Sequence, residues 1–366
     1  MPSFFDNIWR GIGFCFSGTP AQRLNSFRNI FIDALLQKKT LDSFPVMPAL
    51  ELTNHCNLNC EMCSRHWAPL EQGEISESLL KKVERELLPR ISEISLTGYG
   101  EPMLSKNFRR IISSAKKHGV KVFFFTNATL LDSEMAEFLV EKKVDEITVS
   151  VDGATKKSFE KIRINADFEK VIGNVKRLSE LKKRKHSSLP RLRVEFVAML
   201  QNIRELPEMP SLAKSIGAEL LKVTHLAVFD KHFEKQSLVS EARLVHENFE
   251  KTSANAKGLG IRLDLPVDFS ANEGKKIPDC LLPWVHAYVR FDGAVQACCW
   301  FEKAVMGNLN EQSFGEIWNS EKYKRFRKAV NSASPPDACM RCENRFRYIK
   351  NKDFRETYLK MWPRKK

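Results

Sequence analysis

The sequence lacks a hydrophobic run that could cross a membrane. Among its longest apolar runs, "PALEL" at 48–52 and "VFFFT" at 122–126 stay far below the roughly 18 residues that a transmembrane helix requires. Residues 1–18 contain Asp6 and Arg10 and show no small-residue cleavage site, unlike a secretory signal. Internal repeats and low-complexity stretches are also absent. The sequence therefore predicts a cytoplasmic protein with no integral membrane segment.

Acidic residues are scarce relative to basic ones. The chain has 59 Lys and Arg against 45 Asp and Glu, a net charge of +14, and the basic residues concentrate in 176–186 and 322–366. A basic surface favours an anionic partner such as RNA, a phosphorylated substrate or an anionic lipid. A solvated helix face that only keeps the protein soluble explains the same runs. Both interpretations stay open.

Short apolar strands alternate with amphipathic helices from residue 48 onward. Apolar residues make up 43% of the 366-residue chain, as in a packed globular protein. Strands are expected at 49–53, 93–97, 120–126, 145–151, 191–200 and 219–226. Helices are expected at 76–89, 108–119, 133–143, 205–217 and 238–257, with two more before Lys185. This alternation specifies parallel strands that each return through a helix, and we predict an α/β fold with a partial (β/α)6 TIM-like barrel.

After Pro266 the strand–helix alternation stops, and the sequence becomes rich in Gly, Pro and turn dipeptides. "VRFDGAVQACC" at 289–299 places Asp292-Gly293 between alternating strand residues, which is a hairpin signal. A small C-terminal domain of a β-hairpin plus helix is therefore expected. The predicted organisation is an N-terminal helical extension at 1–45, the barrel at 46–235, a connecting helix and strand at 236–269, the small domain at 270–345 and a basic tail at 346–366.

Polar groups follow every predicted strand of the barrel. In a parallel α/β barrel, reactive groups gather at the C-terminal ends of the strands. The groups at these ends are Thr53 to Cys56, Gly98 to Pro102, Thr126 with Asn127, Ser150 with Asp152, Gln201 with Asn202, and Thr224 with His225. Six such ends in register predict one shared site at the mouth of the barrel.

Eight of the nine cysteines lie in clusters, and only Cys15 stands alone. Clustered cysteines in a reducing compartment indicate metal or redox chemistry, whereas Cys15 is expected to be a packed apolar side chain. Cys56, Cys60 and Cys63 form C-x3-C-x2-C after the first strand. A structural zinc site needs four ligands, whereas three thiolates suit a [4Fe–4S] cluster with one open iron. A zinc site completed by a distant ligand remains an alternative.

This spacing, together with "GYGEP" at 98–102 after the second strand, resembles the radical S-adenosylmethionine (SAM) superfamily over about residues 47–230. The resemblance implies that the three cysteines hold a [4Fe–4S] cluster and that the amino and carboxylate groups of SAM chelate its open iron. Contacts to SAM or substrate are implied for Met62, Gly98, Gly100, Glu101, Pro102, Asn127, Ser150 and Asp152. Tyr99 stands where the family usually has Gly. The implied chemistry is one-electron cleavage of SAM to methionine and a 5′-deoxyadenosyl radical, which abstracts hydrogen from a substrate C–H.

A second cysteine set lies near the C-terminus. Cys280 and Cys298 flank Gly293 as C-x12-G-x4-C, and Cys339 and Cys342 form C-x2-C. The set resembles the twitch form of the SPASM extension of radical SAM enzymes and implies one auxiliary [4Fe–4S] cluster held by these four cysteines. A structural zinc ribbon is the alternative, because four thiolates with a C-x2-C pair also satisfy zinc. Cys299 fits the spacing less well than its neighbour and is interpreted as a packed thiol.

Two functions from different classes follow. The leading hypothesis is a radical SAM enzyme that oxidises or modifies a peptide or small molecule, with an anionic substrate suiting the basic tail. The resemblance implies a flavodoxin- or ferredoxin-type electron donor. Asp152 and Glu195 are candidate bases, although the sequence does not select a catalytic residue. The competing hypothesis is a non-catalytic iron–sulfur or zinc protein that binds RNA or a membrane surface. The intact Cys56 and Glu101 favour the enzyme.

Overall fold

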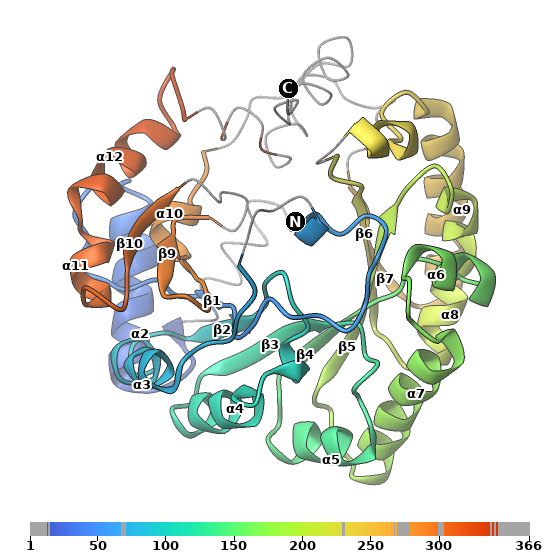
Figure 1. The fold of residues 1–366 in the computed structure, drawn as a ribbon, viewed down its shortest axis with the longest axis horizontal. Helices are drawn as coiled ribbons and strands as arrows, with labels where there is room; N and C mark the ends of the chain where they lie inside the picture. The colour runs from blue at the N-terminus through green and yellow to red at the C-terminus, as the bar shows by residue number, and fades with distance from the viewer. Residues whose placement is uncertain are drawn as a thin grey trace.

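One ten-stranded sheet forms the centre of the computed structural model, which describes residues 13, 15–66, 71–228, 231–266, 268, 279–298, 304–336, 339 and 342. The strand order is β10-β9-β8-β1-β2-β3-β4-β5-β6-β7. The strands are β1 Ala49–Leu50, β2 Glu93–Leu96, β3 Lys121–Thr126, β4 Glu146–Ser150, β5 Arg191–Ala198, β6 Leu220–His225, β7 Arg262–Asp264, β8 Tyr288–Val289, β9 Ala294–Gln296 and β10 Val305–Asn308. The sheet curves like a horseshoe with helices on its outside, and its end strands β10 and β7 do not pair (Figure 1). The predicted partial barrel is therefore confirmed as an open one.

The six predicted strand–helix units are present in parallel order. Their helices are α3 Glu77–Glu86, α4 Phe108–Lys117, α5 Ser133–Glu141, α6 Lys156–Ile162, α7 Phe168–Arg184, α8 Met209–Ser215 and α9 Ala242–Leu259. Several begin at a residue whose side chain accepts a backbone N–H of the first turn, including Ser76, Asp132, Thr155 and Asp167. Such caps satisfy donors that a helix start leaves unpaired. The predicted helix at 205–217 starts instead as a 3-10 segment, Ile203–Glu208, which contains Pro207.

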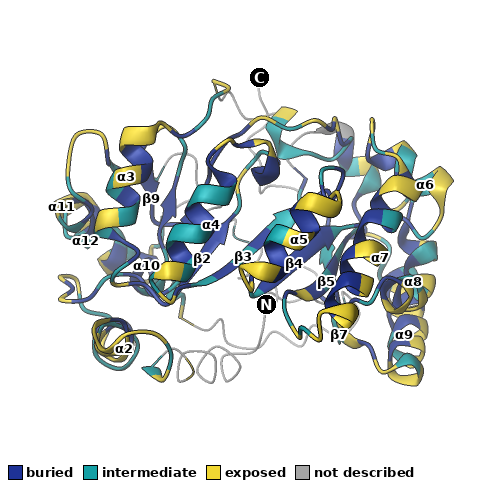
Figure 2. Cartoon of the chain, turned by 90° about the horizontal axis from the view of Figure 1, so that it is seen from below, coloured by how far each residue is buried: buried dark blue, intermediate teal, exposed yellow. Residues whose placement is uncertain are grey.

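Three strands of the barrel, β3, β5 and β6, have one buried and one partly exposed face. In β3 and β5 burial alternates residue by residue, so that Val122 and Phe124 are buried while Phe123 and Phe125 are half-exposed. The buried face packs against the helices, and the other face lines the concave side of the open sheet. Figure 2 shows the same division, with the exposed surface on the outer sides of the helices.

The C-terminal hairpin extends the sheet of the barrel. Its strand β8 pairs in parallel with β1, with Ala49 opposite Tyr288, while β8–β9 and β9–β10 are antiparallel. The turn residue Gly293 has φ +88°, a conformation that glycine adopts without strain, as the Asp-Gly signal predicts. The predicted boundary at residue 270 thus falls between strands of one continuous sheet; the boundaries themselves stay predictions.

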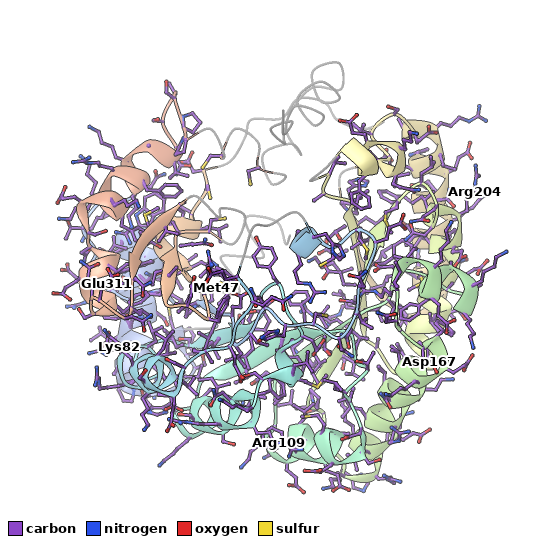
Figure 3. The ribbon with its side chains drawn as sticks, in the orientation of Figure 1. Met47, Lys82, Arg109, Asp167, Arg204 and Glu311 are labelled. Atoms are coloured by element: carbon purple, nitrogen blue, oxygen red, sulfur yellow. The ribbon has the colours of Figure 1, made fainter. Side chains whose placement is uncertain are left out.

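The segment between the hairpin and the C-terminal helices is joined to the first barrel helix. These C-terminal helices are α11 Phe314–Trp318 and α12 Glu321–Val330, and the short α10 Leu282–Val285 precedes the hairpin. Lys82 of α3 donates to the carbonyls of Leu309 and Gln312 at 2.6 and 2.8 Å, and Figure 3 shows Lys82 beside the segment that carries Glu311. The small C-terminal unit is therefore anchored to the barrel by hydrogen bonds as well as by the shared sheet.

Candidate active site

The loop after β1 carries the first three cysteines and is fixed to neighbouring segments. The main-chain N–H groups of Asn59 and Glu61 donate to the carbonyls of Ile164 and Ile162, at 3.0 and 2.9 Å. Arg65 folds back on the same loop, with its guanidinium donating to the carbonyls of Cys56 at 3.3 Å and Leu58 at 2.7 Å. These bonds hold the loop in a defined conformation at the mouth of the barrel.

The three thiols of this loop are near enough to interact electrostatically. The pKa of Cys60 is raised to about 11, mainly by burial and in smaller part by the neighbouring thiolates of Cys63 and Cys56, while Arg163 acts in the opposite direction. Burial also raises the pKa of Cys56. Ligation of iron requires thiolates, so positive charge near the three sulfurs is needed to offset burial and mutual repulsion.

Arg163 supplies that positive charge from the end of α6. Its Nη1 lies 3.8 Å from the sulfur of Cys60, and its Nη2 lies 2.6 Å from Oδ2 of Asp152, which is fully buried. The other oxygen of Asp152 accepts the N–H of Val197 at 2.7 Å. Asp152 is thus engaged on both oxygens, and its position favours a role exerted through Arg163. The sequence analysis missed Arg163, since one arginine in a basic chain gives no local signal for a buried pair.

The "GYGEP" loop packs against the cysteine loop through its glycines. A side chain at Gly100 would approach the carbonyl oxygens of Thr53 and His55 at 2.4 and 2.5 Å, and one at Gly98 would approach the carboxylate of Glu51 at 2.5 Å. The N–H of Glu101 donates to the carbonyl of His55 at 2.9 Å. Close approach of the two backbones therefore requires glycine at position 100, whereas Gly98 leaves room for the side chain of Glu51.

Glu101 is buried beneath this contact and joins three strand ends. Its carboxylate accepts the hydroxyl of Thr126 at 2.9 Å, the N–H of Asn127 at 2.8 Å and the N–H of Met103 at 3.3 Å. Burial raises its pKa to about 7, and these hydrogen bonds act in the opposite direction. Near neutral pH this carboxyl group is therefore partly ionised and partly protonated.

Asn127 connects this carboxylate to the first cysteine. Its Nδ2 lies 3.8 Å from the sulfur of Cys56 and donates to Asn57 at 3.0 Å. The N–H of Leu58 also points to the Cys56 sulfur, at 3.5 Å. Donors near a ligating sulfur stabilise the thiolate and tune the metal it holds.

The other residues assigned by resemblance lie around this centre. Met62 is half-buried on the cysteine loop and packs against the core, and Pro102 is buried after Glu101. Ser150 ends β4 on the concave side, in register with Glu195. Glu195 accepts an ion-paired hydrogen bond from Lys222 at 2.8 Å, so this candidate base is held by a cation. The structure brings the cysteines, Glu101 and Asn127 together, and Ser150 lies at the mouth end of β4, one residue beyond the pair of Thr126 with Val149.

The second cysteine set lies on the C-terminal unit. Cys280 precedes α10 and exchanges main-chain hydrogen bonds with the side chain of Asn331, at 2.8 and 3.2 Å. Cys298 follows β9, is buried, and interacts electrostatically with the buried hydroxyl of Tyr323. Cys339 is buried and Cys342 is half-buried. Cys299 falls outside the described residues. The roles of all these cysteines stay predictions.

The donor set at the mouth fits an iron–sulfur cluster that also binds SAM. Three thiols share one loop, and the Arg163 guanidinium, the Leu58 N–H and the Asn127 amide lie near their sulfurs. The glycine loop that carries Gly100 and the buried Glu101 packs beside them. Among the described residues, no group of three His, Cys, Asp or Glu side chains is arranged to hold a single metal ion. A cubane cluster, by contrast, sits between sulfurs that are further apart than the ligands of one ion.

Family models match both halves of this arrangement. Residues 50–205 match the radical SAM superfamily, and residues 280–343 match an iron–sulfur cluster-binding domain named SPASM. The chain belongs to the radical SAM superfamily and carries a SPASM-type extension. Its cofactors are accordingly SAM with a [4Fe–4S] cluster in the first domain and auxiliary iron–sulfur chemistry in the second. The chain is therefore an enzyme of this class.

Curated relatives align with most of the chain. A tungsten-containing aldehyde ferredoxin oxidoreductase cofactor-modifying protein of Pyrococcus furiosus is 28% identical over 335 residues, 81% of this chain and 86% of the relative. A PqqA peptide cyclase of Gluconobacter oxydans is 24% identical over 320 residues, 84% and 85% of the two chains.

Solved structures share the fold at low sequence identity. Streptococcus suis SuiB bound to SAM has a TM-score of 0.64 at 15% identity, covering 90% of this chain and 80% of that one. The protein anSMEcpe with bound AdoMet has a TM-score of 0.62 at 16% identity, covering 87% and 97%. Within the described part of this chain, every helix is too short or too polar to span a bilayer.

Proposed function

We propose that the enzyme modifies a C–H bond of a peptide substrate at the mouth of the barrel, with a second cluster in the C-terminal unit assisting the oxidation. The observation that carries the proposal is the contrast in donor number: the mouth offers three cysteines on one loop, whereas the C-terminal set offers four. Three ligands leave one iron for SAM, and four close a cluster.

In this proposal Cys56, Cys60 and Cys63 hold the cluster at the mouth. When bound, the cluster supplies the electron that cleaves SAM reductively and generates a radical able to abstract hydrogen. The loop hydrogen bonds fix the three sulfurs, and the Arg163 cation and the Asn127 amide stabilise their thiolates. Glu101, ionised above its pKa of about 7, offers a carboxylate to the amino group of SAM.

The concave side of the sheet supports a polar substrate such as a peptide. Besides the Glu195–Lys222 pair, Glu146 of β4 is paired with Arg193 of β5 at 2.8 Å, so charges of both signs line this surface. The PqqA cyclase, by its name, acts on a peptide, and SuiB has been solved with a precursor peptide. The Pyrococcus relative, by its name, modifies a cofactor, and a small molecule is therefore the alternative substrate.

The proposal further includes a cytoplasmic location and a flavodoxin- or ferredoxin-type electron donor. Thiolate-held clusters persist in reducing compartments, and the SAM-cleaving cluster needs an external electron for each reductive cleavage. The large basic excess of the chain would attract an acidic donor by long-range electrostatics.

Anaerobic reconstitution with iron and sulfide tests the enzyme proposal. With SAM and a chemical reductant, the chain should form 5′-deoxyadenosine, and Cys56→Ala should reduce the yield to that of cluster-free protein. Cys15→Ala is the matched control, since Cys15 lies outside both sets, and it should leave the yield unchanged. No 5′-deoxyadenosine from the wild-type chain, or full yield from Cys56→Ala, would refute the proposal.

A separate experiment tests the substrate class. The reconstituted enzyme is incubated with size-fractionated extract, SAM and reductant, and masses are compared with a reaction that lacks SAM. A change confined to the peptide fraction is expected. A change confined to the small-molecule fraction would overturn the peptide proposal and leave the radical chemistry intact.

A further inference from the structure

The helical extension before the barrel turns polar side chains inward and apolar side chains outward. It consists of α2 Pro20–Phe27 and a π-helix, Arg28–Ala34. The inward residues are 0–1% exposed: Gln22, Ser26, Asn29 and Asp33. The outward residues, here called the outer stripe, are exposed or half-exposed: Leu24, Phe27, Phe31 and Leu35. Both sets recur every three or four residues, so they lie on opposite sides of the helix, the reverse of a normal surface helix.

Buried hydrogen bonds fix this orientation. Gln22 Nε2 donates to the carbonyls of Leu88 and His118 at 3.1 and 3.0 Å, and the hydroxyls of Ser26 and Ser92 are 2.7 Å apart. These partners lie just before β2 and β3 or within the turns that lead into them, so α2 lies at the floor of the barrel, opposite the mouth. Rotating the stripe inward would leave buried polar groups unsatisfied. The buried hydrogen bonds therefore keep the apolar stripe facing outward in the folded protein.

Exposed apolar surface is concentrated on this extension. The most exposed large apolar side chains of the described residues are Phe16 at 79%, Leu36 at 68%, Leu24 at 56%, Phe27 at 50% and Leu35 at 48%. Phe27 and Phe31 also contact each other, with ring centroids 5.4 Å apart. Single exposed apolar residues are ordinary, but a contiguous group of this kind marks an interaction surface.

The charges beside the stripe have one sign. Arg23 and Arg28 are exposed on either side of it. Asp33 is the only acid between residues 15 and 41, and it is buried and paired with Lys38 at 3.3 Å. Arg28 is the C-cap residue of α2, but Arg23 lies before its last turn, so compensation of the helix dipole does not explain Arg23.

The floor carries further positive charge at the ends of the barrel helices. Barrel helices run opposite to the strands, so their C-terminal ends lie at the floor. Exposed basic residues follow or complete these ends, including Lys117, Lys142, Lys143, Lys183 and Arg184. Basic residues suit helix C-termini, and together they give the floor a positive rim (Figure 2 shows the exposed helix ends).

We propose that the floor docks on an anionic phospholipid surface, with the outer stripe in the acyl boundary and Arg23 and Arg28 against phosphate groups. A lipid surface offers both an apolar layer and anionic groups above it, which matches the outer stripe with an arginine on either side. A second copy of the chain would place the same cations opposite each other across a two-fold axis, which is repulsive. The mouth then faces away from the membrane and stays open to substrate.

Sedimentation of the full chain with vesicles tests this proposal. The protein should sediment with vesicles of phosphatidylcholine mixed with phosphatidylglycerol and remain in solution with phosphatidylcholine alone. The double change Leu24→Gln with Phe27→Gln should weaken binding at least about tenfold, because two large apolar side chains no longer leave water. Each of Arg23→Gln and Arg28→Gln should weaken it about fivefold.

The matched control is the double change Leu104→Gln with Leu200→Gln. These leucines are 40% and 38% exposed but lie at the mouth, so vesicle binding should be unchanged. All variants should keep the wild-type circular dichroism spectrum and thermal midpoint, because the altered side chains are exposed. The proposal would be overturned if the stripe variants bound vesicles as tightly as the wild type. It would also be overturned if the protein were a monomer that bound neither kind of vesicle, or a dimer that Phe27→Gln dissociates.

Discussion

The two cysteine sets of this protein lie in surroundings of different kinds. The three cysteines at the mouth share one loop, and side chains from distant elements reach their sulfurs: Asn127 after β3 and Arg163 at the end of α6. The C-terminal four come from separate segments, and Asn331 holds Cys280 through its main chain. The difference teaches that the three cysteines on one loop rely on the surrounding barrel for contacts to their sulfurs, whereas the C-terminal set, with four cysteines, is expected to supply all its own ligands.

The largest expected effect comes from breaking the support of the open site. Asp152→Ala leaves Arg163 buried without its partner, which should lower the free energy of unfolding by about 3–5 kcal/mol. Urea denaturation of the cluster-free protein measures this. Glu134→Ala is the control, because its pair with Arg109 is exposed and should contribute at most about 1 kcal/mol. Equal losses of stability in the two variants would show that the buried pair of Asp152 with Arg163 stabilises the fold no more than an exposed pair does.

The pH dependence of stability tests the burial of Glu101. Its pKa is raised from 4.5 to about 7 by burial. Between these pH values the folded chain holds a proton that the unfolded chain has lost, so the free energy of unfolding should fall as pH rises and level off above about 7. Glu101→Gln cannot titrate, and its curve should lack this fall, which amounts to about 3 kcal/mol. Parallel curves for the two proteins would contradict the assignment.

Packing between the two loops at the mouth gives a smaller effect. Gly100→Ala places a methyl group against two carbonyl oxygens and should cost about 1–3 kcal/mol. It should also weaken SAM binding, measured by calorimetry on the reconstituted protein. Gly173→Ala is the matched control, since nothing lies within 4 Å of the added carbon and alanine favours the helix by up to about 1 kcal/mol. A neutral Gly100→Ala would mean that the loops are free to separate.

The smallest expected effect concerns the closed set. Asn331→Ala removes the hydrogen bonds to the main chain of Cys280 and should cost about 1–2 kcal/mol. It should lower iron content at the auxiliary site while the 5′-deoxyadenosine yield persists. Loss of that yield would show that the two sets are not independent.

Local patterns in the sequence predicted the barrel, and they grouped the cysteines into two sets whose metal-binding roles stay predictions. Strand–helix alternation and the spacing of Cys56, Cys60 and Cys63 are properties of neighbouring residues, so they are visible without a structure. The pairing of Arg163 with Asp152, and that of the two-residue strands β1 and β8, join distant segments and leave no local trace. The sequence predicts a helical extension at 1–45 but not the reversed orientation of α2, because periodicity does not say which side of a helix faces inward.

The response of each cluster to SAM tests the central claim most directly. Electron paramagnetic resonance spectra of the reduced protein are recorded with and without SAM for Cys298→Ala, which retains the cysteines of the mouth, and for Cys60→Ala, which retains the other set. The account predicts that SAM changes the spectrum of Cys298→Ala and leaves that of Cys60→Ala unchanged. A SAM-dependent change in Cys60→Ala, with none in Cys298→Ala, would contradict it.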